Sequence, residues 1–122
     1  MGVTRAGLAA IAALVIADAT YLATGTGTTA FASTQTTLVT EITDSGLERA
    51  TSTMTRQTTT YTNDTSQAVK AWSVTGTKTI AEVGWFDAAS VGNMYARTKL
   101  STTRSVVNGD IYTLTYKIIG AI

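Results

Sequence analysis

The sequence predicts a mainly β protein: an antiparallel β-sandwich, jelly-roll-like in outline, with one amino-terminal α-helix. Threonine, a β-branched residue that favours strands, supplies 27 of the 122 residues. Alternating segments separated by turn residues recur about every ten to fifteen residues, which is typical of sandwiches and small barrels. The length and the 44% hydrophobic content fit one domain. Within it we expect the apolar helix in residues 1–19 and the sandwich in residues 20–122.

The composition excludes several kinds of functional site. The chain has no cysteine, no histidine and no proline, and its formal net charge is +1. Without cysteine or histidine it cannot hold a disulfide framework, a thiol nucleophile, a Cys-type zinc site or a Ser-His-Asp triad. A nearly neutral chain also lacks the field that holds a phosphate backbone. We therefore expect no enzyme activity, cofactor, metal, nucleic acid, membrane or small-molecule substrate.

The apolar run from Leu8 to Ala17 predicts a buried helix. Thr4 is placed to cap its first turn. The residues expected on one face are Leu8, Ile11 and Val15, with Leu14 beside them. A helix this apolar needs cover on most sides, so we expect it to pack on the sandwich or on a neighbouring subunit.

The same run also fits a secretory signal peptide. Arg5 supplies a basic start, and residues 17–19 have the small-x-small form of a cleavage site. The run is too short to span a bilayer. A secreted binding domain is therefore an alternative, which cleavage after Ala19 would distinguish.

The rest of the chain predicts strands separated by turns. The expected strands are residues 20–23, 50–62, 68–75, 78–86, 94–100 and 111–119, while residues 37–42 fit a strand or a turn of helix. Turn residues are expected at 44–46, 63–66, 88–93 and 108–110. This order favours a sandwich over an alternating α/β fold.

Residues 25–30, Gly-Thr-Gly-Thr-Thr-Ala, match the form G-x-G-x-x-A of a dinucleotide-binding turn. That turn works only inside a βαβ unit, with a strand before it and a helix after it. Here it lies between an apolar helix and a β-rich remainder. We interpret it as a flexible connection.

Glu82 is the one carboxylate expected inside an otherwise apolar strand. Most other acidic residues lie in predicted turns, where aspartate caps local backbone groups, and no calcium-loop pattern is present. We expect Glu82 to pair with a cation on an adjacent strand, either Arg97 or Arg56, rather than to act in catalysis.

Trp85 and Phe86 are neighbours on one predicted strand, so their side chains point to opposite faces. We expect one face to fill the sandwich core and the other to meet a sister subunit. Together with Leu8, Ile11 and Val15, they are the candidate residues of an oligomer or capsid interface.

Several short motifs follow one another over nearly the whole chain. They are T-x-A-G at 4–7, A-x-G-x-G-T-T at 23–29, T-x-L-x-x-E-I at 36–42, E-V-G-(aromatic)-F-D at 82–87, M-x-A-R at 94–97 and V-x-x-G-D-x-Y-x-L-T-Y at 106–116. In this order they resemble small structural proteins of tailed-bacteriophage virions. No catalytic residue is among them.

The resemblance implies a virion component of one of two kinds: a head decoration (cement) protein, or a tail, tail-fibre attachment or baseplate adaptor protein. Fibres usually continue in long repeats, so the short length favours decoration. We therefore expect a non-enzymatic protein on the head exterior, assembled in the host cytoplasm. Its expected partners are the major capsid protein and copies of itself, as a homotrimer or homodimer that stabilises the shell by mass action. Copy number per virion would distinguish the tail alternative.

Overall fold

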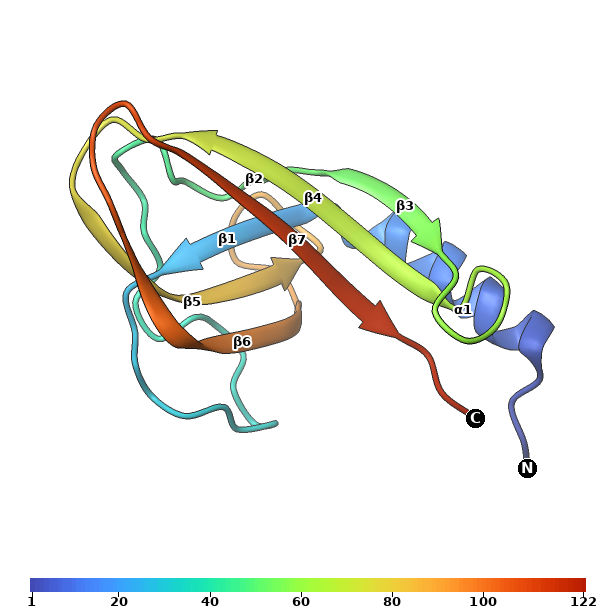
Figure 1. The fold of residues 1–122 in the computed structure, drawn as a ribbon. Coiled ribbons are helices and arrows are strands. Elements are labelled where there is room, and N and C mark those ends of the chain that lie inside the picture. Colours follow the sequence, from blue (N-terminus) through green and yellow to red (C-terminus); the bar gives the residue numbers. More distant parts are fainter.

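The computed structural model describes residues 1–122 as a β-sandwich with one helix (Figure 1). The elements are α1 (Arg5–Asp18), β1 (Tyr21–Gly25), β2 (Ala50–Thr51), β3 (Thr53–Gln57), β4 (Thr65–Ser73), β5 (Lys78–Phe86), β6 (Met94–Val106) and β7 (Ile111–Ile119). The expected mainly β class and the single helix are confirmed.

The strands form two antiparallel sheets. One has four strands in the order β2-β1-β5-β6, and the other has three in the order β3-β4-β7. The connection from β6 to β7 joins the two sheets at one end of the molecule (Figure 1). Because β6 and β7 are each the last strand of their sheet, both leave one backbone edge unpaired on this side of the sandwich.

The prediction of one long strand over residues 50–62 is wrong. Residues 50–51 pair with β1 in the first sheet, whereas residues 53–57 pair with β4 in the second. The chain changes sheets at Ser52, whose N–H donates to the carbonyl of Thr20 at 2.9 Å. A turn with Asn63 in the left-handed region (φ 58°) then leads into β4, which already begins at Thr65.

Residues 26–42 form an irregular loop, so residues 37–42 are neither a strand nor a helical turn. The loop pairs with the first sheet through one isolated bridge, between Gly25 and Glu41. β6 is longer than predicted, because its far end pairs with the start of β5, where Lys78 lies opposite Val106. β5 and β7 have the predicted bounds.

The main core lies between the sheets around Trp85 and Trp72. The indole of Trp85 donates to the carbonyl of Ala19 at 2.6 Å and packs edge-on against Tyr116. A smaller cluster, formed by Ala23, Leu38 and Phe86, lies on the outer face of the four-stranded sheet under the 26–42 loop. The sheet is therefore covered on both faces at this point.

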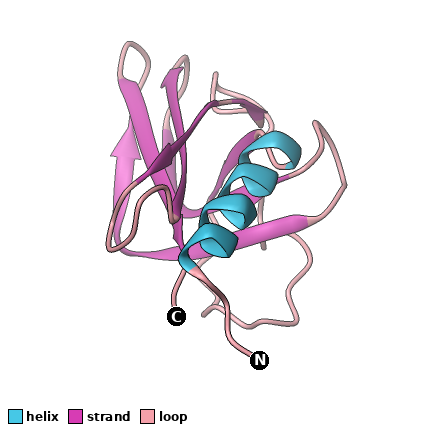
Figure 2. Cartoon of the chain, turned by 90° about the vertical axis from the view of Figure 1, so that its right-hand side faces the viewer, coloured by secondary structure: helices cyan, strands magenta, loops and turns pink.

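Helix α1 packs against β3 and β4 at one end of the sandwich (Figure 2). Thr4 caps it as predicted, accepting from the N–H of Gly7 at 3.0 Å. Leu8 and Ala12 are buried, but Ile11 is 51% exposed. The predicted inner face is therefore only partly right. Ala12 lies against β4, where the hydroxyl of Ser66 donates to its carbonyl, and this places Ile11 on the flank of the helix.

Leu14, expected beside the inner face, is 69% exposed. No helix in the structure has the length and apolar character needed to span a membrane.

Candidate functional site

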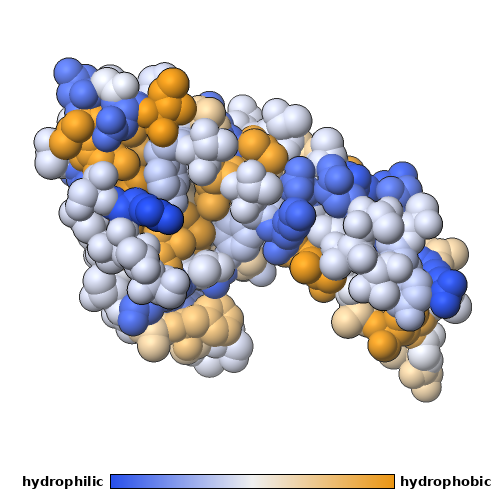
Figure 3. Space-filling model, in the orientation of Figure 1, coloured by the Kyte–Doolittle hydropathy of each residue, from blue (hydrophilic) through white to orange (hydrophobic).

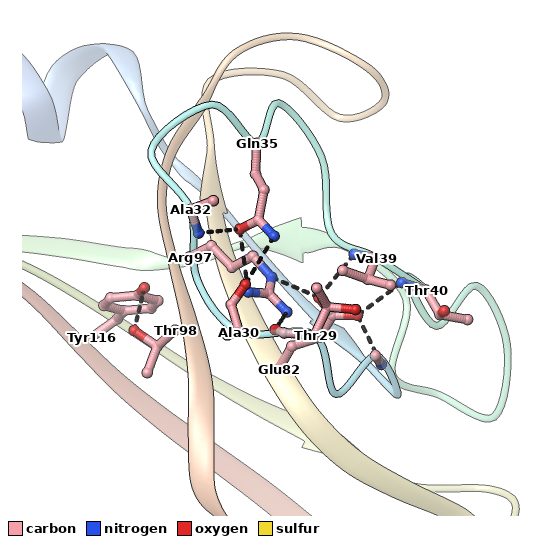
Figure 4. A network of polar contacts seen from close by, with 11 residues as sticks. Thr29, Ala30, Ala32, Gln35, Val39, Thr40, Glu82, Arg97, Thr98 and Tyr116 are labelled. Atoms are coloured by element: carbon pink, nitrogen blue, oxygen red, sulfur yellow. Dashed lines mark hydrogen bonds and ion pairs between the residues drawn. The ribbon is translucent and has the colours of Figure 1, made fainter.

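A buried ion pair joins β5 to β6 on the outer face of the four-stranded sheet (Figure 4). Arg97 Nε donates to Glu82 Oε1 at 2.9 Å, and neither side chain is exposed. The predicted pairing of Glu82 with Arg97 is confirmed. Arg56, the other candidate partner, instead donates to the carbonyl of Ala9 at 3.2 Å.

The ion pair fastens the 26–42 loop to the sheet. Backbone N–H groups of Gly27, Val39 and Thr40 donate to the Glu82 carboxylate at 2.9, 2.9 and 2.8 Å. The remaining Arg97 nitrogens donate to the carbonyl of Thr29 at 2.9 Å and the side chain of Gln35 at 3.2 Å. These contacts, the Glu82 network, hold the loop at both ends and at its middle.

The two glycines of the G-x-G motif make room for this carboxylate. A Cβ at Gly27 would lie 2.4 Å from Glu82 Oε2, and one at Gly25 would lie 2.5 Å from the same atom. The close backbone approach that dinucleotide-binding turns use for a pyrophosphate therefore serves here to admit a side-chain carboxylate. The motif contains no helix N-terminus that could bind phosphate.

Burial alone would raise the pKa of Glu82. The N–H donors of Thr40 and Val39, then Arg97 and Gly27, outweigh this effect and hold the pKa below its usual value. The carboxylate is thus ionised near neutral pH and occupied by four donors. A group in this state has neither a proton to give nor access to a substrate, so it is not suited to acid–base catalysis.

The 26–42 loop presents an apolar side chain to solvent. Gln35 accepts from the N–H of Ala32 at 3.1 Å and donates to the carbonyl of Ala30 at 3.2 Å. Phe31, between these two residues, is 59% exposed. In Figure 1 the loop, drawn in cyan, projects from the body of the molecule. The Glu82 network, which includes Thr29 and Gln35 on either side of Phe31, therefore fixes a loop that displays a phenylalanine.

A second charged network lies at the other end of the same sheet and was not predicted. Arg49 donates to both carboxylate oxygens of Glu41, at 2.7 and 3.2 Å, and to the carbonyls of Ala88 and Val91. Its guanidinium also lies 3.6 Å from the centre of the Phe86 ring. Both partners lie in irregular segments, so no periodic pattern connects them in the sequence.

Other aspartates cap turns, as the sequence predicts. Asp64 accepts from the N–H groups of Thr59, Thr60 and Tyr61, and these bonds hold its pKa far below the usual value. Asp87 accepts from Asn93 in the predicted 88–93 turn. No group of three or more acidic side chains converges on one point.

The predicted interface residues occupy different environments. Trp85 and Phe86 are both fully buried within one chain, and Leu8 is also buried. Val15 is half-buried against the core, whereas Ile11 reaches solvent. The second face of β5 is covered by the chain's own 26–42 loop, so no sister subunit is needed to bury Phe86. The interface role of these five residues stays a prediction.

A groove runs between β6 and β7 on the open side of the sandwich. It consists of two adjoining hollows of about 400 and 200 Å³. The residues common to both are Leu100, Leu114 and Thr115, with Tyr112 and Arg104 at one end and Val83, Thr98 and Tyr116 at the other. Figure 3 shows hydrophobic surface between more hydrophilic areas on the visible face of the molecule.

Comparison with known proteins identifies one family. The sequence model of the family described as "Podophage GP4 fiber I protein gp80" matches residues 8–120. No curated protein and no solved structure matches. The family description fits the tail-fibre alternative better than capsid decoration. The chain belongs to the podophage GP4 fiber I protein gp80 family and is a structural protein of a bacteriophage virion.

Proposed function

We propose that this protein is a tail-fibre component of the virion, placed on the tail rather than on the head exterior. The family match, which extends over residues 8–120, is the observation that carries the proposal. Its printed description names a fibre protein of a podophage, and it names no capsid role. Short length, the property that favoured decoration, does not distinguish the two once a fibre family matches nearly the whole chain.

The proposed role is non-enzymatic. Three carboxylates that could have served in catalysis, Glu82, Asp64 and Asp87, are engaged by backbone N–H donors. The histidine and cysteine that most often carry acid–base and nucleophilic chemistry are absent from the chain. The polar networks support a mechanical role, because they fasten loops to the sandwich.

As partners we propose copies of this chain and another protein of the tail. Fibres act at several points on one particle, and several weak attachments on one rigid partner sum to a strong one. The 26–42 loop and the open groove are the surfaces that this role would use.

Particles that lack the protein provide the test. We expect them to package and retain DNA on heating as well as wild-type particles do, and to adsorb to host cells at a strongly reduced rate. Supplying the wild-type chain in trans should restore adsorption. Normal adsorption combined with DNA loss at lower temperature would overturn the proposal in favour of capsid decoration.

A further inference from the structure

A tight turn over residues 32–35 follows Phe31 in the chain. The N–H of Gln35 closes it by donating to the carbonyl of Ala32 at 3.0 Å. The Gln35 side chain also bonds to the backbone of Ala30 and Ala32, the two neighbours of Phe31 (Figure 4). Phe31 itself is 59% exposed. One glutamine thus fixes the backbone on both sides of an aromatic side chain that the fold leaves in solvent.

The buried ion pair holds this turn to the sheet. Arg97 donates to the side-chain oxygen of Gln35 at 3.2 Å and to the carbonyl of Thr29 at 2.9 Å. Residues 29–35, the Phe31 turn, therefore lose little conformational freedom when they bind a ligand, and such preorganisation increases affinity. Arg97 is fully buried against Glu82, so its charge is not presented to a ligand. The Phe31 turn is an ordered and uncharged surface.

Hydroxyl groups surround Phe31 in the sequence of this loop. Residues 26–37 contain no charged residue and seven exposed serine and threonine residues: Thr26, Thr28, Thr29, Ser33, Thr34, Thr36 and Thr37. The bonds that hold the Phe31 turn use backbone groups and the side chains of Gln35 and Arg97. The hydroxyls of Ser33 and Thr34, which directly follow Phe31 and Ala32, are left free for a ligand.

An exposed aromatic ring among free hydroxyls has the chemistry that recognises a neutral saccharide. One face of a pyranose ring carries C–H groups that pack on an aromatic side chain. Its hydroxyls both donate and accept hydrogen bonds, as the hydroxyls of serine and threonine do. An apolar protein pocket that closed over Phe31 would instead remove water from the neighbouring hydroxyls without replacing their hydrogen bonds, which is unfavourable. A charged ligand would meet no counter-charge on residues 26–40.

We propose that the Phe31 turn binds a neutral saccharide of the host cell surface. Phe31 stacks on one sugar ring, and the hydroxyls of Ser33 and Thr34 bond to the hydroxyl groups of the sugar. The inference rests on the proposed function for the source of the saccharide, since a tail fibre meets the cell during adsorption. One such contact is weak, with a Kd of about 1 mM, but the copies on one particle sum to a strong attachment.

Three variants separate ring stacking from other roles of this loop. Phe31→Ala removes the aromatic ring, whereas Phe31→Tyr keeps a ring of the same shape and adds a hydroxyl that a wet surface accepts. Val91→Ala is the matched control, because Val91 is 82% exposed and lies outside the loop. Both positions are exposed, so all three variants should fold, which melting curves check.

The probe is the surface polysaccharide of the host strain, extracted and freed of lipid, and biolayer interferometry measures its binding to the purified protein. Wild type, Phe31→Tyr and Val91→Ala should bind alike, and Phe31→Ala should bind at least about tenfold more weakly. Periodate, which cleaves the vicinal diols of sugars, should abolish binding of the treated probe. A wild type that does not bind at about 10 mM sugar repeats would overturn the proposal. So would equal binding by Phe31→Ala, lost binding by Phe31→Tyr, or unchanged binding of the oxidised probe.

Particles that carry Phe31→Ala distinguish failure of this inference from failure of the proposed function. We expect them to adsorb to host cells at a strongly reduced rate, as particles without the protein do. Normal adsorption of the Phe31→Ala particles, beside poor adsorption of particles without the protein, would overturn the saccharide site and leave the tail-fibre role intact. Normal adsorption of both kinds of particle would overturn the tail-fibre role and, with it, the host-surface source of the saccharide.

Discussion

Glu82 and Arg97 form an ion pair from which solvent is excluded: Nε and Oε1 lie 2.9 Å apart, and both side chains have an exposed fraction of 0%. The pair lies on adjacent strands but acts on a distant segment, because three backbone N–H groups of the 26–42 loop share the same carboxylate. A charge inside the fold thus determines where a surface loop lies.

Glu82→Gln should destabilise the protein by about 3 kcal/mol, because it leaves the Arg97 guanidinium buried without its counter-charge. Denaturation in urea at neutral pH measures this change. Glu48→Gln is the control, since Glu48 is exposed and its side chain makes no hydrogen bond in the structure. Equal stability of the Glu82 variant and the control would show that the pair does not hold the loop.

Gly27→Ala should destabilise the protein by about 1 to 3 kcal/mol, because the added Cβ would lie 2.4 Å from the Glu82 carboxylate and 2.5 Å from Val39. Amide hydrogen exchange should become faster in residues 26–42. Gly2→Ala is the matched control, since a Cβ there meets nothing within 4 Å. Unchanged exchange in the loop of the Gly27 variant would contradict the close approach of Gly27 to the Glu82 carboxylate.

Acidification should weaken the fold through Asp64. Its pKa is lowered in the folded protein by the N–H donors of Tyr61, Thr59 and Thr60, so its contribution is complete above the unfolded pKa of about 3.9 and is lost as pH falls toward the folded value. Asp64→Asn should therefore be less stable than wild type at pH 7, and the difference should shrink below about pH 4. Urea denaturation at several pH values measures this. A difference that stays constant with pH would contradict the assignment.

Substitutions in α1 should follow the observed face of the helix. Ala12→Asp should abolish soluble folded protein, because Ala12 is 3% exposed and packs against β4. Ile11→Asp should keep stability within about 1 kcal/mol, since Ile11 is 51% exposed. Circular dichroism and thermal melting of both proteins give the comparison. The reverse result would mean that the opposite side of the helix is buried.

Local patterns predicted much of this fold. The bounds of β5 and β7, the Thr4 cap and the Glu82–Arg97 pair follow from alternation, capping chemistry and the cost of burying a charge. Residues 50–62 were mispredicted because the threonine alternation continues through Ser52, where only tertiary pairing moves the chain to the other sheet.

The contacts made by the loops could not be predicted from the sequence. Arg49 and Glu41 form an ion pair, but both lie in irregular segments. The pair could not be predicted because irregular backbone gives the sequence no periodic pattern. The burial of Phe86 could not be predicted for the same reason, because Leu38, which packs against it, lies in the irregular 26–42 loop. Periodicity correctly placed Trp85 and Phe86 on opposite faces, but it could not distinguish a covering loop from a covering subunit.

A cryo-EM map of intact particles would show where on the virion the protein lies. We expect density for this fold on the tail, in a few to a few dozen copies, with none on the capsid lattice. Density for the fold repeated over the head surface, in hundreds of copies, would contradict it.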